Sequence, residues 1–309
     1  MKNHPLQQYA FAAIDLTVTP QGDWYFIEAN SWPGVLRETM EVAQTKLCRP
    51  LEQLFALMET VVSPVKIHYI ESSKHLNNAI KNPIFIQNYY LNKLGKEHFV
   101  THEIADTEPE TLDTWFTKHK EHIRDGIILT RFIKVKELLH KHNILNVINP
   151  APVSLLTINK FRISTELESN EYFSVPKTFL CTKPEEVERH VTLHNLNKIV
   201  LKPRYGQKGI GVTFMHANDL KLDTLDWQLE WVLQEQVETA MKDGKYWDIR
   251  ANVINGTFTD SLLRTSDSRV VSITQGGEAL PIPPNIQAIA KTASEACVRM
   301  INTLAYKKP

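Results

Sequence analysis

The amino-acid sequence predicts a mixed fold in which antiparallel α+β regions flank a small α/β unit. Its 309 residues suffice for about two domains of roughly 100–200 residues each. The chain starts with a hairpin pattern and continues with short strands that alternate with helices. Its second half combines strands, clustered glycines and one long closing helix. Alternating strands and helices are typical of a parallel sheet, which places the α/β unit in the middle.

The first sixty residues predict a hairpin followed by a helix. Apolar stretches on both sides of a Thr-Pro-Gln-Gly-Asp turn are typical of paired strands. A polar, turn-rich stretch follows, and a helix with a proline inside it comes next. The expected elements are strands at Phe11–Val18 and Trp24–Ile27, a turn at 19–23, and a helix at Leu36–Met58 with Pro50 as a potential break.

The middle of the chain predicts the α/β unit, which ends near the Asn149-Pro150-Ala151-Pro152 stretch. We expect strands at Val65–Ile70, Ile84–Gln87, Gly126–Thr130 and Val147–Ile148, and helices at Lys74–Lys81, Glu110–His122 and Lys134–His142.

The remaining residues predict a second α+β region. We expect helices at Asn159–Glu168, Pro184–His194 and Asn285–Leu304, and extended segments at Val175–Leu180, Lys198–Lys202, Trp231–Val237 and Ile249–Ile254.

Composition argues against several classes of function. Lys plus Arg and Asp plus Glu both number 35, so the net basic field that nucleic acids and anionic membranes require is missing. No apolar run approaches the roughly 18 residues of a membrane span, and the first residues lack the apolar core of a signal peptide. The cysteines, Cys48, Cys181 and Cys297, are odd in number and far apart, which favours the reducing cytoplasm.

A glycine cluster follows the strand that ends at Lys202. The chain has only 11 glycines, yet Gly206, Gly209 and Gly211 lie within six residues and enclose Lys208. Backbone N–H groups of such a loop can surround phosphate oxygens, and Lys202 can add a point charge. The pattern is neither a Walker loop nor a Rossmann fingerprint, because a strand follows it. A hairpin turn that needs glycine for positive φ explains it equally well.

Three oxygen-bearing side chains lie on the first hairpin. Glu28 and Asn30 are two residues apart, so in a strand they point to one face, and Asp15 can meet them from the partner strand. Such hard oxygen ligands suit Mg²⁺ held together with nucleotide phosphates. A hydrated polar hairpin end is the alternative.

Two further patterns bear on an anionic ligand. Arg250 and Arg264 lie on consecutive strands and can face a phosphate or carboxylate, although surface ion pairs are the alternative. The strand that leads into Glu235-Gln236-Val237-Glu238 can offer backbone groups to a purine edge and a carboxylate to ribose. An ordinary strand end has the same pattern.

Together these motifs resemble one family. Asn159-Lys160, Val175–Thr178, the stretch from Ile199 through the glycine cluster to Val212, Gln234-Glu235, Asp248-Ile249-Arg250, Arg264 and Gln275-Gly276-Gly277 occur in the order of an ATP-grasp module, over about half of the chain. The resemblance is strongest to glutathione synthetases, ribosomal-protein glutamate ligases and spore-coat-associated ATP-grasp proteins.

The resemblance has one departure in chain order. In this family the metal-binding acids follow the closing helix, whereas here Ala13-Ile14-Asp15-Leu16 and the Phe26–Gly34 motif begin the chain. The resemblance therefore implies a circular permutation with the old ends rejoined near 60–64, which exposed loops tolerate. Two alternatives stay open: the chain is a piece of a longer tandem protein, or the hairpin completes the site of a second copy.

The implied architecture is an ATP-grasp fold of two α+β subdomains that sandwich ATP, plus a small Rossmann-like pre-ATP-grasp domain. Residues 1–62 would be the permuted end of the core with the metal-binding hairpin, and 65–155 the α/β substrate domain. Residues 156–238 would be the nucleotide-binding subdomain, and 239–309 the C-terminal subdomain.

The resemblance also implies roles for individual residues. Lys160 and Lys202 would contact the nucleotide phosphates, and Arg250 and Arg264 would face the transferred phosphate and the acyl phosphate. The other roles are phosphate closure by Gly206, Gln207, Lys208, Gly209 and Gly211; adenine contact by the backbone of Glu235, Gln236 and Val237; ribose contact by Glu238; and two Mg²⁺ ions on Asp15, Glu28 and Asn30, with Glu28 bridging. Val271-Ser272-Ile273-Thr274 departs from the family, which often has Asn there.

The implied activity is an ADP-forming carboxylate–amine ligase that uses Mg-ATP, acts through an acyl phosphate and forms a C–N bond on small-molecule or peptide substrates. A kinase of related fold is one alternative, which the few arginines of the α/β unit, Arg124 and Arg131, disfavour. A non-catalytic ATP-binding or peptide-binding protein is the other. We expect no nucleic-acid or membrane partner and a cytoplasmic location, and we leave a homodimer open.

Overall fold

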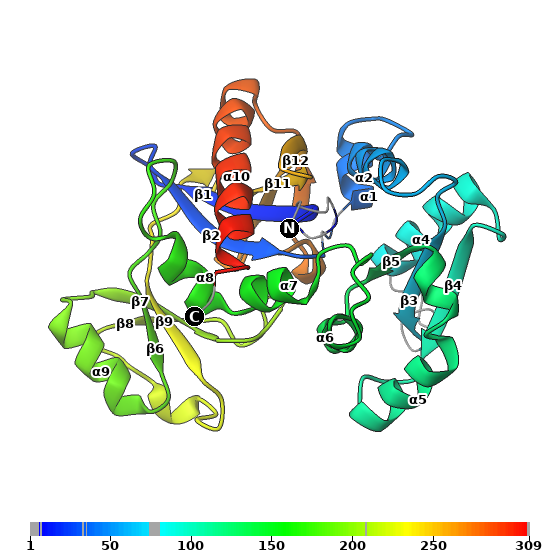
Figure 1. Cartoon of the computed structure of the whole chain (residues 1–309). Coiled ribbons are helices and arrows are strands. Elements are labelled where there is room, and N and C mark those ends of the chain that lie inside the picture. The colour runs from blue at the N-terminus through cyan, green and yellow to red at the C-terminus, as the bar shows by residue number, and fades with distance from the viewer. Residues whose placement is uncertain are drawn as a thin grey trace.

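Three sheets organise the chain in a computed structural model, which describes residues 6, 8–32, 34, 36–73, 81–207 and 209–307. Two of the sheets are antiparallel; helix α8 (Lys160–Leu167) contacts both of them, and helix α7 (Ala151–Ile158) contacts the larger one. The third is parallel and belongs to a separate α/β unit on the right of Figure 1. The predicted combination of α+β regions with an α/β unit is confirmed.

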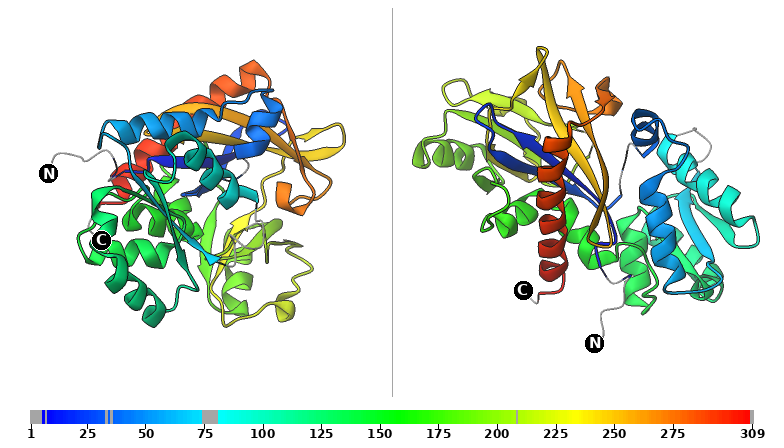
Figure 2. Two further views of the ribbon diagram at one scale, coloured as in Figure 1. Left: turned by 90° about the vertical axis from the view of Figure 1, so that its right-hand side faces the viewer. Right: turned by 90° about the horizontal axis from the view of Figure 1, so that it is seen from above.

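The larger antiparallel sheet joins the two ends of the sequence. Its strand order is β13-β12-β11-β1-β2, and β10 pairs with β11, so the N-terminal hairpin extends a sheet built from residues beyond 240. One face packs on α10 in a continuous apolar core, as Figure 2 shows. The elements are β1 (Phe11–Val18), β2 (Trp24–Asn30), β10 (Met241–Lys242), β11 (Lys245–Ile254), β12 (Thr257–Ser266), β13 (Glu278–Leu280) and α10 (Pro284–Leu304).

The smaller antiparallel sheet has the order β6-β9-β7-β8 and is covered on one side by α9. The glycine cluster connects its neighbouring strands β7 and β8, so this sheet carries the loop at one edge. Its elements are β6 (Thr178–Cys181), α9 (Pro184–Leu193), β7 (Lys198–Pro203), β8 (Thr213–His216) and β9 (Trp231–Glu235).

The α/β unit has three parallel strands in the order β4-β3-β5, with apolar clusters on both faces. Helices α1 and α2 pack between this unit and the large sheet, where α2 contributes most of its apolar residues to a shared core. The elements are α1 (Leu36–Val42), α2 (Arg49–Glu59), β3 (Ile67–Ser72), α4 (Lys81–Leu94), β4 (Phe99–Ile104), α5 (Pro109–His119), β5 (Ile127–Thr130) and α6 (Ile133–Lys141).

Two expected elements differ from the structure, and one stays untested. The strand predicted at Ile84–Gln87 is wrong, because these residues belong to α4, where Ile86 and Tyr90 recur at helical spacing and are both fully buried. The strand of this region is β4, which the sequence did not predict. The long helix at Leu36–Met58 is two helices, separated before Pro50, which lies in the first turn of α2. The helix predicted at Lys74–Lys81 falls mostly outside the described residues.

The start of the hairpin lies beside the end of the closing helix. The Tyr9 backbone N–H donates to Asn302 Oδ1 near the C-terminus of α10, at 2.5 Å. Asn149 fixes the same hairpin from the α/β side: its Oδ1 accepts the N–H groups of Ala10 and Phe11, and its Nδ2 donates to the carbonyl groups of Phe11 and Ser31. In the part of the chain that the structure describes, no helix is long and apolar enough to cross a membrane.

Candidate functional site

Acidic and basic side chains line one face of the large sheet, opposite the face that packs on α10. The register places Asp15 between Arg250 on β11 and Glu28 on β2, and pairs Asp248 with Arg264. The alternation of side chains along each strand sends Asp248 and Arg250 to the same face, away from the buried Ile249. The pairing of Asp15 with Glu28 that the sequence predicts is therefore present in the sheet.

Four of these residues, Asp15, Asp248, Arg250 and Arg264, form a buried cluster that we call the ion quartet. Arg250 binds Asp15 through two hydrogen bonds of 2.7 and 2.6 Å, and Arg264 binds Asp248 with the same two distances. Arg264 also reaches Asp15 at 3.0 Å. Each of the four is at least nine-tenths buried. The two carboxylates and two guanidinium groups neutralise one another, and their attraction offsets the free-energy cost of removing them from water.

The quartet keeps its carboxylates ionised at neutral pH. Burial acts to raise the pKa of Asp15, but the charges and hydrogen bonds of Arg250 and Arg264 outweigh it and hold that pKa below its ordinary value. Burial raises the pKa of Asp248 to about 6 against the opposing effect of Arg264. Both acids are therefore charged at pH 7, and both guanidinium groups have a fixed orientation.

Two lysines on other elements lie near Glu28, and we call the region between these lysines, Glu28 and the ion quartet the cleft. Lys160 is the first residue of α8, a helix that Asn159 caps by accepting the Arg162 N–H. Lys202 lies near the end of β7 and is 8 % exposed, and its ammonium group makes no hydrogen bond or ion pair within the described residues. Burial lowers the pKa of both, that of Lys202 to about 8, while the negative charge of Glu28 acts to raise each. Glu28 thus lies within electrostatic reach of both lysines.

The glycine loop extends from these lysines toward the large sheet. The Lys160 ammonium donates to the Gly206 carbonyl. Gly209 has φ +71°, and a Cβ there would collide with the side chain of Val270, on the loop after β12. The loop therefore touches both halves of the cleft. Lys208 lies outside the described residues.

The predicted adenine-binding segment follows β9. The N–H groups of Glu235 and Gln236 already donate to the carbonyl groups of Lys177 and Lys198. A purine could therefore reach these two residues through their carbonyl oxygens only. Val237 follows them at partial exposure, and Glu238 is exposed beside them.

The oxygen atoms of Asp15, Glu28 and Asn30 are of the kind that binds Mg²⁺, but not all of them are free to do so in this arrangement. Glu28 and Asn30 share one face of β2, and the Asn30 Nδ2 donates to Glu28 Oε1 at 3.1 Å. Asp15, in contrast, has both carboxylate oxygens bonded to guanidinium groups. Within the described ranges, no group of three or more His, Cys, Asp or Glu side chains could hold a metal. The structure thus brings Asp15, Glu28 and Asn30 together, but the carboxylate oxygens of Asp15 are already bonded to arginine side chains.

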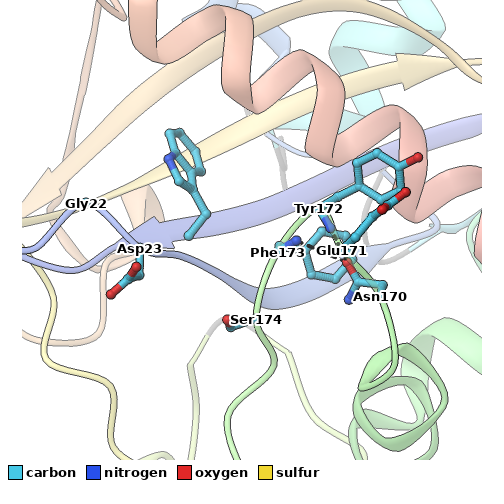
Figure 3. Close-up of a pocket in the computed structure, with 8 residues that line it drawn as sticks. Gly22, Asp23, Asn170, Glu171, Tyr172, Phe173 and Ser174 are labelled. Carbon is cyan, nitrogen blue, oxygen red and sulfur yellow. Dashed lines mark hydrogen bonds between the residues drawn. The ribbon is translucent and has the colours of Figure 1, made fainter.

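A separate hollow of about 290 Å³ lies at the opposite end of the hairpin (Figure 3). Its lining comes from the β1–β2 turn and the loop after α8, with the carboxylates of Asp23 and Glu171. Because β2 runs from Trp24 at this hollow to Glu28 and Asn30 at the cleft, the two places are distinct. The hollow has no basic side chain in its lining, so it does not suit a polyphosphate.

Sequence reasoning missed three residues that support the site. Asp248 was noted in the Asp-Ile-Arg motif, but its bond to Arg264 depends on the β11–β12 register. Arg204 anchors the start of the glycine loop through two bonds to Glu230 and one to Asn159. Asn149 holds the hairpin. Only the position of Arg204 directly after Lys202-Pro203 could have drawn attention to it.

Comparison with known proteins identifies the fold. No protein-family model matches the sequence, and no curated protein matches significantly. Solved structures do match. A D-alanine–D-alanine ligase from Bacillus anthracis is 15% identical, with 77% of this chain and 79% of that chain covered and a TM-score of 0.52. The D-cycloserine synthetase DcsG is 14% identical, with 76% and 81% covered and a TM-score of 0.50.

A third structure covers more of the chain. A protein from Methylobacillus flagellatus KT assigned as a gamma-glutamylcysteine synthetase is 13% identical, with 96% of this chain and 88% of that chain covered and a TM-score of 0.50. Identities this low establish the fold alone. The chain therefore has a mixed α/β structure, with parallel and antiparallel sheets, that matches the folds of ATP-grasp ligases.

Proposed function

We propose that the protein is an ATP-dependent ligase that joins a carboxylate to an amine through an acyl phosphate and releases ADP. The observation that carries this proposal is the meeting of two opposite walls at Glu28. One wall offers Lys160, Lys202 and the glycine loop, and the other offers the ion quartet. A polyphosphate needs the first wall, and transfer of its terminal phosphoryl group needs fixed positive charge on the second.

Each group has a defined part in this proposal. Lys160, Lys202 and the loop from Gly206 to Gly211 bind the phosphates, and the carbonyl groups after β9 face the base, with Glu238 near ribose. Arg250 and Arg264 stabilise charge on the transferred phosphoryl group and on the acyl phosphate. Glu28 and Asn30 hold Mg²⁺, which neutralises phosphate charge when bound. The proposed catalysis is positioning and electrostatics, so no nucleophilic side chain is required.

We also propose that the chain is a circular permutant of the usual ATP-grasp order. Two contacts support this. The start of β1 is hydrogen-bonded to the end of α10, where the usual order would continue directly into the metal-binding hairpin. In addition, β1 pairs with β11 of its own chain, so a second copy is not needed to complete the sheet. The proposed units are 1–62, 65–155, 156–238 and 239–309.

The test is ADP release with Mg²⁺ across a panel of amino acids and peptides. Wild type should release ADP only when both a carboxylate and an amine are supplied. Lys202→Ala should lose nucleotide affinity, and Glu28→Gln should lose turnover. Lys66→Ala serves as the control, because Lys66 pairs with Asp125 in the α/β unit, away from the cleft. ATP binding that survives both cleft substitutions would contradict the assigned site.

The same assay separates the alternatives. ADP release that requires a hydroxyl compound and no amine would indicate a kinase. Nucleotide binding without ADP release over the whole panel would favour a binding protein. The arginines of the quartet speak against the latter, since a pure nucleotide binder has no need for two buried guanidinium groups at this position.

A further inference from the structure

We propose that Arg250 masks Asp15 from divalent cations in the nucleotide-free chain, so that the cleft accepts Mg²⁺ only together with a nucleotide. This inference deepens the proposed function and rests on it for the nucleotide. It concerns the order in which the ligands enter, and it departs from the simple expectation that three oxygen ligands form a ready-made metal site.

The first reason is that Asp15 has no free oxygen. Its Oδ1 accepts from Arg250 Nε at 2.7 Å, and its Oδ2 accepts from Arg250 Nη2 at 2.6 Å and from Arg264 Nη2 at 3.0 Å. Its side chain is 2 % exposed. A cation that approached Asp15 would meet a guanidinium group at each oxygen, and paired geometry of this kind is among the strongest that side chains make.

The second reason is the charge of the whole cleft. The quartet is neutral, Glu28 adds one negative charge, and Lys160 and Lys202 add two positive charges, so the described groups carry a net charge of +1. Arg250 also lies 3.9 Å from Glu28. A free cation is therefore repelled from the one carboxylate that remains accessible, and a single carboxylate makes a weak Mg²⁺ site.

A bound nucleotide changes both the bonding of Asp15 and the net charge of the cleft. Its phosphates reverse the charge of the cleft and give Arg250 a second anionic partner, for which the guanidinium fork is well suited. Asp15 can then turn an oxygen toward a cation that the phosphates already hold. In this scheme Arg250 binds Asp15 in the nucleotide-free chain and turns to a phosphate when the nucleotide arrives.

The test measures Mn²⁺ binding to the full chain by the loss of the free-ion EPR signal, with and without ADP, and subtracts the signal lost to the Mn–ADP complex in matched samples without protein. Wild type should bind Mn²⁺ weakly alone and at least about tenfold more tightly with ADP. Arg250→Gln should bind Mn²⁺ without nucleotide at least about tenfold more tightly than wild type, because it exposes the Asp15–Glu28 pair. Adding Glu28→Gln to this variant should remove the gain.

Arg131→Gln is the matched control. Arg131 also pairs with a fully buried carboxylate, that of Glu71, at 3.1 Å. Its loss exposes one acid instead of two neighbouring acids, so Mn²⁺ affinity should stay at the wild-type value. Nucleotide-free binding by wild type as tight as with ADP, or no gain in Arg250→Gln, would overturn the masking.

A second variant covers the case in which Arg250→Gln does not fold, which circular dichroism would reveal. Asp15→Asn should leave nucleotide-free Mn²⁺ binding unchanged and weaken binding with ADP by about tenfold. An unchanged affinity with ADP would overturn the exchange of partners. If ADP fails to bring Mn²⁺ into wild type, the proposed nucleotide site is wrong, whereas the nucleotide-free measurements on Arg250→Gln judge the masking alone.

Discussion

The cleft and the small α/β unit both bury titratable groups, but burial has different consequences for the protonation of these groups. In the cleft, the quartet keeps four formal charges and pairs each with a carboxylate or guanidinium group. In the α/β unit, the Arg131–Glu71 ion pair is also present, but burial shifts two histidines and one lysine toward their neutral forms. Burial lowers the pKa of His102 to about 4 and that of His68 below its ordinary value, and it lowers the pKa of Lys136 to about 7.

This difference separates structural burial from functional burial. The His68–His102 contact of 2.9 Å works with neutral rings, since one ring donates and the other accepts. A neutral pair costs little to bury and contributes packing. The quartet costs more because four ions leave water, and an apolar cluster would serve stability as well or better. Charge retained at that cost indicates a use for it, which in our proposal is phosphoryl transfer.

The strongest test of this difference between the two regions is to remove one ion from the quartet. Arg264→Met leaves Asp248 unpaired and Asp15 with one partner fewer, so it should lower the free energy of unfolding by about 3–5 kcal/mol. The double variant Arg264→Met/Asp248→Leu removes a complete pair and should recover most of that loss. Urea denaturation of both variants measures this. A double variant as unstable as the single one would show that the pairing is not what supports the site.

The next effect is expected at Lys136 in the α/β unit, which is 1 % exposed and donates to Ser154 Oγ at 3.0 Å. Burial lowers its folded pKa to about 7, so below pH 7 the folded state carries the full cost of a buried ammonium. Between about pH 7 and 10 the unfolded state holds a proton that the folded state has lost, and stability rises with pH. Lys136→Met should stabilise by about 2 kcal/mol at pH 7.

The pH dependence is the check on this prediction. The advantage of Lys136→Met over wild type should shrink steadily as denaturation is repeated from pH 7 to pH 9. The Ser154 hydroxyl loses its donor Lys136 in the variant but still donates to the Asn149 carbonyl, so it is not left without a hydrogen bond. An advantage that is constant over this range would mean that Lys136 does not titrate there.

The same contrast explains what the sequence could predict. The hairpin strands were predicted with the correct start, and the turn fixes the register locally as far as Leu16 opposite Phe26. Asp15 lies opposite Glu28 because the register shifts by one residue between Asp15 and Leu16, which the sequence did not predict. The bond from Arg250 to Asp15 could not be predicted, because it requires β1 to insert beside β11, 235 residues away. The bond from Arg264 to Asp248 depends instead on the register of β11 against β12, which the sequence does not fix. The strand predicted at Ile84–Gln87 failed because a short apolar run fits a helix and a strand equally.

A smaller effect is expected from the imidazole pair in acid. His68 Nε2 contacts Asp125 Oδ1 at 2.8 Å, and His68 Nδ1 contacts His102 Nε2. Because the folded pKa of His102 lies below its ordinary value, the unfolded state takes up protons first as pH falls from about 6.5 to 4, and stability decreases over that window. His102→Gln keeps an N–H donor without the titration. Its stability should fall by about 1 kcal/mol less than that of wild type between pH 6.5 and 4.5.

The smallest expected effect concerns Lys202, a cleft group that lacks the opposite charge the quartet supplies to its members. Its pKa of about 8 means that it loses its proton in mildly alkaline solution. Phosphates favour the charged ammonium, so nucleotide binding should be coupled to proton uptake, and ADP affinity should fall by about threefold from pH 7 to pH 9. Calorimetry in two buffers of different ionisation enthalpy measures the uptake. Lys202→Arg keeps its charge over this range and should show neither effect. A wild-type affinity independent of pH would mean that Lys202 does not face the phosphates.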